Sequence, residues 1–269
     1  MLWNAKNGRV GIGGTEMEYV SFGAGKKAFV ILPGLSDGLA TVGGKALLLA
    51  KPYKIFFDKY TVYMFSRKNA MPDGYSIRDM AADQAEAMRS LGIGKAAVMG
   101  VSEGGLIAQY LVIDSPGLVE KLVIAVSAPC ANDVIRSRLC DWLAFTDKGD
   151  HKQLMIDTAE NSYSPEKLKQ YRKLYPVIGS VGKPSDYTRF RRNAEAILGF
   201  DATAELAKIA CPTLIIGGEE DRIVGADASR ELHRRIAGSE LYLYPGLGHA
   251  AYEEAADFNP RVLRFLEGN

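Results

Sequence analysis

The sequence has little that could cross-link the chain or anchor it in a membrane. Its 269 residues include only three cysteines, Cys130, Cys140 and Cys211, which cannot all pair with one another. A disulfide framework is therefore not expected, and this favours a reducing compartment. The first residues lack the apolar core of a signal peptide, and no apolar run approaches membrane-spanning length. We expect a cytoplasmic protein with no membrane partner.

The sequence also lacks an excess of charge of either sign. Its 33 Lys and Arg residues nearly balance 32 Asp and Glu, for a formal net charge of +1. This balance gives no electrostatic reason to bind nucleic acid. The chain has neither the Cys/His spacing of a metal site nor a Gly-rich phosphate-binding loop. We therefore expect no metal and no cofactor, and a small molecule as the partner.

Apolar and amphipathic segments alternate over most of the chain. The expected strands are 15–22, 28–32, 60–65, 96–101, 121–126, 212–218 and 241–244. The expected helices are 45–57, 76–91, 106–113, 226–236 and 253–266, with the last kinked or split by Pro260. This alternation predicts an α/β fold, with a doubly wound, mostly parallel sheet covered on both faces. The first strand is expected to pair antiparallel at one edge.

The alternation stops in the middle of the chain. From residue 129 to residue 200 the sequence is helical in pattern and richer in Arg, Lys, Tyr and Asp. We interpret this stretch as a helical lid inserted between two parts of one core, residues 1–128 and 201–269. The aromatic residues of the lid are expected to pack it onto the core rather than to line a pocket.

A Gly-x-Ser-x-Gly pattern with Ser102 at its centre follows the strand at 96–101. An amphipathic helix at 106–113 comes directly after it. Between a strand and a helix, this pattern makes a sharp turn that strains the serine backbone and lifts its hydroxyl above the sheet edge. Gly100 and Gly104 suit the turn because a side chain at either position would collide with the neighbouring strand or helix.

A serine hydroxyl becomes a useful nucleophile only with a base within hydrogen-bond reach and an acid that orients the base. Of the three histidines, only His249 lies in a loop directly after an expected strand. That loop belongs to the carboxyl edge of the sheet, where ligands bind in open α/β folds. His233 lies inside a helix and His151 lies in the lid, so His249 is the candidate base.

The orienting acid is expected in the loop that follows the next-to-last strand. This loop contains Glu219, Glu220 and Asp221 and also ends at the carboxyl edge of the sheet. We select Asp221, with its two neighbours as the alternatives.

The chain resembles the α/β-hydrolase fold superfamily, in the lid-bearing branch that includes esterases and carbon–carbon bond hydrolases. The resemblance covers nearly the whole chain and is carried by four segments: Leu32–Leu35, Gly100–Gly105, Pro212–Val224 and Gly246–His249. It implies Ser102 as nucleophile, His249 as general base and then acid, and Asp221 as the residue that orients the imidazolium. Nucleophile, acid and base also follow one another in the family's chain order.

The same resemblance implies an oxyanion hole made of two backbone amides. One is the N–H of Glu103, which follows the nucleophile at the start of a helix. The other comes from the loop after the strand at 28–32, and we select Leu35. Pro33 cannot supply it because proline has no amide hydrogen.

The chain departs from many members of the superfamily in two loops. Pro33-Gly34 stands where many have His-Gly, which removes a local hydrogen-bonding group. Residues 66–70 stand where many carry an Asp and a Gly-rich loop. We interpret Arg67 and Lys68 there as a solvated basic loop rather than as an anion site.

A second basic cluster lies in the lid. Arg189, Arg191 and Arg192 are close together in the sequence and could face a carboxylate of the substrate. We interpret them instead as a solvated helix face.

The sequence predicts a hydrolase that cleaves a small or medium carboxylic ester through an acyl-enzyme, as a monomer or homodimer. A carbon–carbon bond hydrolase, a lactonase or an amidase would use the same triad, and the sequence does not separate them. The serine at the elbow argues against dehalogenases and epoxide hydrolases of this fold, which use an aspartate there. A receptor-like module with slow or no turnover is the alternative from another class, but the intact Ser, Asp and His favour an enzyme.

Overall fold

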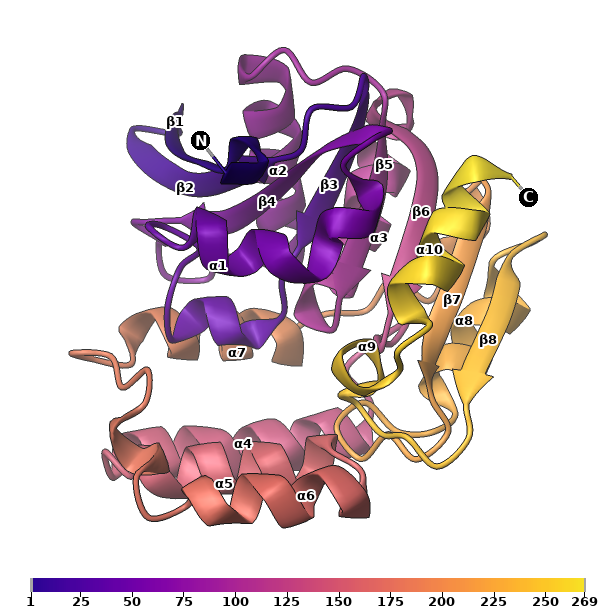
Figure 1. Ribbon diagram of the computed structural model, residues 1–269. Coiled ribbons are helices and arrows are strands. Elements are labelled where there is room, and N and C mark those ends of the chain that lie inside the picture. The colour runs from indigo at the N-terminus through magenta and orange to yellow at the C-terminus, as the bar shows by residue number, and fades with distance from the viewer. Residues whose placement is uncertain (1, 269) are drawn as a thin grey trace.

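The computed structural model describes residues 2–268 and contains one eight-stranded sheet (Figure 1). The strands are β1 (Lys6–Ile12), β2 (Thr15–Phe22), β3 (Lys27–Leu32), β4 (Tyr60–Lys68), β5 (Ala96–Val101), β6 (Val119–Ala125), β7 (Thr213–Gly218) and β8 (Glu240–Tyr244). Their order across the sheet is β1-β2-β4-β3-β5-β6-β7-β8. The β1–β2 and β2–β4 pairs are antiparallel, and every neighbouring pair from β4 to β8 is parallel. The expected mostly parallel α/β fold is confirmed.

Helices cover both faces of this sheet. In Figure 1, α1 and α10 lie in front of the sheet, whereas α2 and α3 lie behind it. The helices of the core are α1 (Ala46–Ala50), α2 (Ile77–Ser90), α3 (Glu103–Asp114), α8 (Ala228–Arg235), α9 (Ala251–Glu254) and α10 (Phe258–Glu267). Two apolar clusters fill the space on the two sides, one with residues of α2, α3 and α8 and the other with residues of α1 and α10. Within residues 2–268, no helix combines the length and the apolar character needed to span a membrane.

Short 3-10 helices complete the secondary structure. They are η1 (Leu2–Asn4), η2 (Leu35–Gly38), η3 (Lys51–Phe56), η4 (Pro116–Leu118), η5 (Arg172–Leu174), η6 (Ile178–Ser180) and η7 (Leu206–Lys208). The second residue of η3 is Pro52, so the expected helix at 45–57 changes from α1 to a 3-10 helix near that proline. The η2 helix matters most for function because it follows β3 at the carboxyl edge of the sheet.

The four helices between β6 and β7 lie below the carboxyl edge of the sheet, the first three as a separate layer and the fourth between that layer and the sheet (Figure 1). They are α4 (Asp133–Asp147), α5 (His151–Ser162), α6 (Pro165–Tyr171) and α7 (Thr188–Leu198). Polar caps start three of them, since the side chains of Asn132, Asp150 and Ser164 each accept a backbone N–H of the first turn. These helices lie within the stretch 129–200 in which the sequence loses its strand–helix alternation.

The edge of the sheet differs from the expectation. The hairpin partner of β2 is β1, which the sequence analysis missed, so β2 lies inside the sheet and β1 at its edge. The pattern of β1 is polar and contains Gly8, which weakens any strand signal. The structure gives the reason for this glycine, because a Cβ there would come within 2.3 Å of the Tyr19 ring.

The C-terminal helical segment is split, as expected, but not at its proline. The break between α9 and α10 covers residues 255–257. Pro260 lies in the first turn of α10. Backbone N–H groups of the first turn have no acceptor within the helix, so a proline there costs no hydrogen bond.

The turn at residues 100–104 gives a prediction about stability. A Cβ on Gly104 would lie 1.9 Å from the carbonyl oxygen of Leu32, and this backbone atom of β3 cannot move aside. Gly104→Ala should therefore lower the free energy of unfolding by about 1–3 kcal/mol or more, as overpacking does elsewhere. Gly117→Ala is the matched control because a Cβ there meets nothing within 4 Å. Equal thermal midpoints for the two variants would contradict this account of the turn.

Candidate active site

The candidate site begins with the one-residue turn between β5 and α3. Ser102 has φ 55° and ψ −118°, a conformation that non-glycine residues rarely adopt. The turn is this sharp because β5 and α3 approach closely at Gly100, where a Cβ would lie 2.2 Å from the Gly104 carbonyl oxygen. The glycines expected at these positions are therefore required, and the serine hydroxyl stands at the sheet edge.

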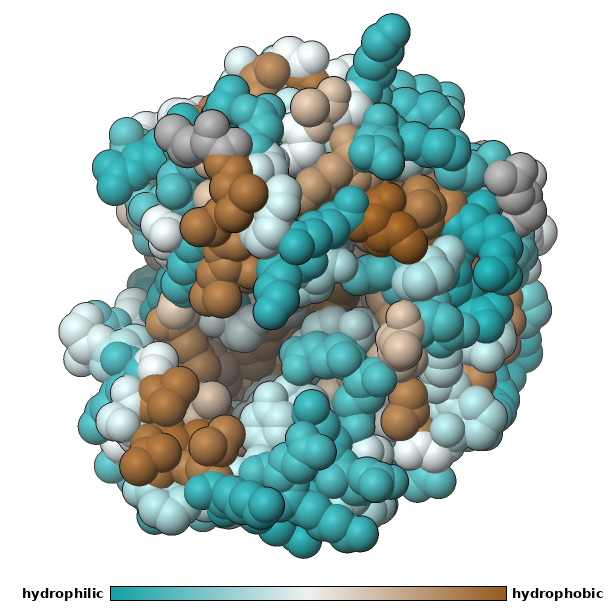
Figure 2. All heavy atoms as spheres, viewed as in Figure 1, coloured by the Kyte–Doolittle hydropathy of each residue, from teal (hydrophilic) through white to brown (hydrophobic). Residues whose placement is uncertain are grey.

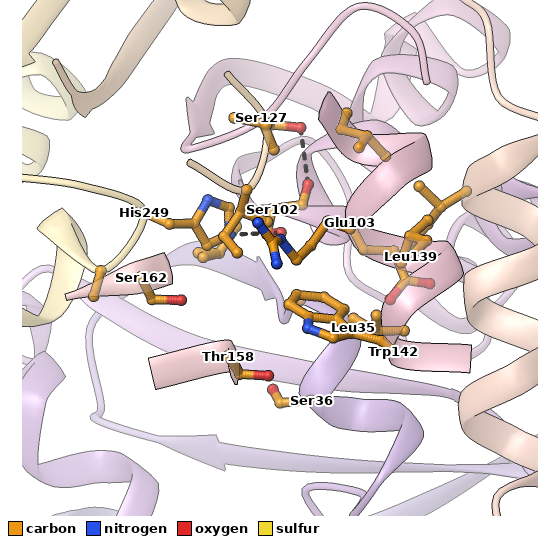
Figure 3. A pocket seen from close by; sticks show the side chains of 18 of the residues that line it. Leu35, Ser36, Ser102, Glu103, Ser127, Leu139, Trp142, Thr158, Ser162 and His249 are labelled. Atoms are coloured by element: carbon orange, nitrogen blue, oxygen red, sulfur yellow. Dashed lines mark hydrogen bonds between the residues drawn. The ribbon is translucent and has the colours of Figure 1, made fainter. Parts of the chain in front are cut away.

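The neighbouring strand supports this turn, which the sequence analysis did not foresee. The hydroxyl of Ser127 donates to the Ser102 carbonyl oxygen at 2.8 Å (Figure 3). Just before it, Val126 has φ 45°, a strained value for a β-branched residue. The two strained residues, Ser102 after β5 and Val126 after β6, therefore lie on neighbouring segments, and the bond from Ser127 joins these segments. The sequence feature that could have revealed this support is Ser127, which directly follows the apolar strand expected at 121–126.

The structure brings together the three side chains that the sequence analysis selected. His249 Nε2 lies 3.0 Å from Ser102 Oγ, and His249 Nδ1 lies 2.8 Å from Asp221 Oδ2. With Nδ1 donating to the carboxylate, Nε2 is left to accept the serine proton. The other carboxylate oxygen of Asp221 accepts the backbone N–H groups of Ile223 and Val224 at 2.8 and 3.0 Å. These bonds fix the acid, and through it the imidazole.

The two alternative acids point elsewhere. Glu219 is exposed and lies 3.4 Å from Arg230, while Glu220 is also exposed. Asp221 is buried, with 6% of its surface accessible, and is the acid in contact with His249. The geometry therefore favours the selection of Asp221.

The two selected amides lie beside the serine. Leu35 is the first residue of η2 and Glu103 is the first residue of α3, so both N–H groups belong to the unpaired first turn of a helix. Within the part of the chain that the structure describes, no hydrogen bond uses either N–H. Both residues line the same cavity as Ser102 and His249. Their donation to an oxyanion stays a prediction.

This cavity, of about 260 Å³, lies between the core and the lid. Figure 2 shows the surface hollowed between these two parts, with hydrophobic residues along the border of the hollow. Its apolar wall is made by Leu106, Ile135, Leu139, Trp142, Leu154, Met155, Phe190, Ile197, Ile223 and Val224. In Figure 3, Trp142 and Leu139 lie across the cavity from His249. Trp142 and Phe190 pack within an apolar cluster of the core, as expected of the lid aromatics, but they also line the cavity, and so does Tyr163.

Arg67 is part of the sheet and not of a solvated loop, so that expectation was wrong. Strand β4 runs to Lys68, three residues beyond the expected end at residue 65. The Arg67 side chain is fully buried, and its Nη2 lies 2.9 Å from Glu103 Oε2 and donates to the Pro33 carbonyl oxygen at 2.7 Å. Lys68, also expected to be solvated, lies 3.1 Å from Asp83.

Arg189 was also wrongly expected to face solvent. Its Nη2 donates to the buried Asp37 carboxylate at 2.6 Å and to the Arg67 carbonyl oxygen at 2.8 Å. Asp37 in turn accepts the backbone N–H of Arg67 at 3.0 Å. The lid helix α7 is therefore joined to η2 and β4 through charged groups. Arg191 and Arg192 form ion pairs with Asp147 and Asp73.

The buried Glu103 carboxyl has a shifted pKa. Burial disfavours the ionised form and raises its pKa to about 7, although the neighbouring Arg67 guanidinium acts in the opposite direction. The sequence did not reveal this pair, because Arg67 lies on β4 and Glu103 begins α3, and each reads as a surface residue.

The comparisons with known proteins agree with the fold. Residues 63–256 match the family model described as "alpha/beta hydrolase fold". The chain belongs to this family.

Two curated relatives and one solved structure illustrate its similarities. The α/β hydrolase is 26% identical to "Putative carbamate hydrolase RutD" of Caulobacter sp. (strain K31), over 87% of this chain and 90% of that protein. It is 25% identical to the human serine hydrolase BPHL, over 96% of this chain and 86% of that protein. The crystal structure of the enol-lactonase from Burkholderia xenovorans LB400 matches with a TM-score of 0.82 and 21% identity, covering 97% of this chain and 100% of that one. At this identity the last similarity concerns the fold.

The contacts of His249 give a prediction for this α/β hydrolase. A proton shared between His249 Nδ1 and the Asp221 carboxylate should give a far-downfield proton NMR signal. Asp221→Asn should abolish the signal, because an amide cannot accept this proton as a carboxylate does and allows the wrong imidazole tautomer. Glu219→Gln and Glu220→Gln should leave it in place. If either of these removes the signal while Asp221→Asn keeps it, the acid has been wrongly assigned.

Proposed function

We propose that this α/β hydrolase is a serine hydrolase that cleaves a small or medium carboxylic ester through an acyl-enzyme. The observation that carries the proposal is the pair of hydrogen bonds from Ser102 to His249 and from His249 to Asp221, at 3.0 and 2.8 Å. A serine with this base and this acid is the arrangement that attacks acyl carbons on several unrelated folds. The names of the relatives, a serine hydrolase and a carbamate hydrolase, add support for acyl chemistry.

In the first half of the reaction, Ser102 Oγ forms a bond to the acyl carbon while its proton moves to His249 Nε2. The carbonyl π electrons move onto oxygen, and the N–H groups of Leu35 and Glu103 donate to the resulting oxyanion. Asp221 stabilises the imidazolium. Each oxyanion donor is worth about 2.7–4 kcal/mol in the transition state in enzymes of this kind.

In the second half, the tetrahedral intermediate collapses and the bond to the leaving alkoxide breaks. The alkoxide takes the proton from His249 Nε2 and leaves as an alcohol. Water then attacks the acyl-serine with His249 as base, and collapse of the second intermediate returns the proton to Ser102 Oγ. The products are a carboxylic acid, an alcohol and the free enzyme.

The cavity supports an acyl group of limited size. Its volume of about 260 Å³ and its apolar wall suit a short acyl chain or a small ring. Lactones, carbamates, amides and diketone acids present an acyl carbon to the same triad. To rank these substrate classes, turnover is measured for one member of each class and compared with that of p-nitrophenyl acetate and p-nitrophenyl butanoate.

The test of the proposal is intact-protein mass spectrometry after exposure to a fluorophosphonate. We expect one adduct, located on Ser102, because the probe reacts with activated serines. Ser102→Ala should remove it and His249→Ala should strongly slow its formation. An unlabelled wild type, or a label on another residue, would overturn the proposal.

The receptor-like alternative gives a different pattern. It predicts that a ligand protects the lid from proteolysis without multiple turnover of any of the substrates compared above. If an ester is turned over many times and Ser102→Ala abolishes this turnover, the protein is an enzyme and not a receptor.

The wall of the cavity gives a prediction about substrate size. Leu139 lines the cavity, so Leu139→Trp should raise KM for p-nitrophenyl butanoate several-fold more than KM for the acetate. Val134 lies on the same helix but is 42% exposed and does not line the cavity, so Val134→Trp is the control. Equal effects of both variants on both esters would show that α4 does not contact the acyl chain.

A further inference from the structure

The two amides proposed to bind the oxyanion come from separate segments of the chain. Leu35 begins η2, in the loop after β3, and Glu103 begins α3, after β5. A tetrahedral intermediate is stabilised only if both N–H groups point at one oxygen position. Some contact must therefore fix the distance between the two segments.

One buried side chain touches both segments. Arg67 Nη2 donates to the carbonyl oxygen of Pro33 at 2.7 Å and lies 2.9 Å from Glu103 Oε2. Pro33 comes two residues before Leu35, and between them Gly34 is extended, with φ −75° and ψ −165°. A Cβ on Gly34 would lie 3.2 Å from Ser102 Cβ, so this loop runs close to the nucleophile. When Arg67 holds the Pro33 carbonyl oxygen in place, it therefore also fixes the direction in which the Leu35 N–H points.

The far end of the same loop is fixed by the backbone of Arg67. Its N–H donates to Asp37 Oδ2 at 3.0 Å, and Asp37 lies within η2. Arg189 of the lid adds donors to Asp37 and to the Arg67 carbonyl oxygen. The loop bearing Leu35 is thus tied at both ends to one residue of β4.

Stability does not explain why this charge pair is buried. The side chains of Arg67 and Glu103 have no accessible surface, and a buried ion pair commonly recovers no more than the cost of removing both charges from water. The raised pKa of Glu103 reflects that cost. Replacing a buried ion pair with apolar side chains of similar volume is often neutral or stabilising, so the position that the charges impose is what the pair contributes here.

We propose that Arg67 is a positioning residue, which holds the amides of Leu35 and Glu103 at the separation that the oxyanion requires. The proposal rests on the proposed function, because an oxyanion forms only if Ser102 attacks an acyl carbon. Arg67 acts through the Pro33 carbonyl and the Glu103 carboxyl and does not touch the substrate itself.

The test is the double variant Arg67→Met/Glu103→Met, which replaces the pair with apolar side chains and keeps both amides. We expect a folded protein whose thermal midpoint falls by only a few degrees, because neither charge is left without its partner and only the Pro33 carbonyl oxygen loses a donor. The kcat for an ester that the wild type hydrolyses should fall about 10- to 1000-fold, with KM changed by less than about threefold, as for loss of a transition-state contact. Inhibition by a boronic acid, which forms a tetrahedral adduct with the serine, should weaken by a similar factor.

The control is Lys68→Met/Asp83→Asn. This variant removes an ion pair of 3.1 Å that starts from the next residue of β4 and touches neither amide-bearing segment. Its kcat should stay within about twofold of the wild type, because no contact of the oxyanion is lost. An equal loss of kcat in both double variants, or wild-type kcat and boronic acid affinity in Arg67→Met/Glu103→Met, would overturn the positioning role.

Arg67→Lys covers the case in which the double variant does not fold. Lysine keeps the positive charge but lacks the rigid guanidinium fork, so we expect kcat to fall while KM is retained. An unchanged kcat would overturn the proposal. The proposed function is judged separately, by fluorophosphonate labelling of Ser102 in the wild type.

Discussion

At Ser102 the chain passes from a buried strand to a buried helix within a single residue. The rest of the site depends on the close approach of β5, α3 and β3 that permits this turn. Gly100 and Gly104 let β5, α3 and β3 approach to distances that any Cβ would prevent. The strain at Ser102 is compensated by β5, which is buried along its whole length, and by the bond from Ser127. The result is a hydroxyl held in one position at the sheet edge, together with an unpaired amide directly after it.

The parallel sheet explains how distant segments meet this hydroxyl. Parallel strands end at the same edge, so the loops after β3, β7 and β8 converge on the end of β5. These loops supply Leu35, Asp221 and His249. The lid lies below the same edge (Figure 1), and its side chains contribute to the apolar wall of the cavity, which in the proposed function limits the size of the acyl group. Sheet topology thus fixes the reacting groups, and the inserted helices shape the space in front of them.

Much of this arrangement could be predicted from the sequence, for identifiable reasons. Ser102, Asp221 and His249 lie in short motifs, each directly after an apolar strand, so local pattern and chain order together pointed to one edge. The buried charges could not be found in this way. Arg67, Asp37 and Arg189 read as surface residues because charged side chains are usually solvated, and their partners are distant in sequence. Strand β1 was missed because its sequence is polar and contains Gly8, so that nothing in its pattern signals a strand.

The proposed reaction requires that Ser102 becomes acylated during turnover. The most direct measurement is peptide mass spectrometry of the enzyme after rapid acid quench during hydrolysis of p-nitrophenyl butanoate. We expect the butanoyl mass on the peptide that contains Ser102. Acylation of a different residue, or turnover during which Ser102 stays unmodified at every quench time, would contradict it.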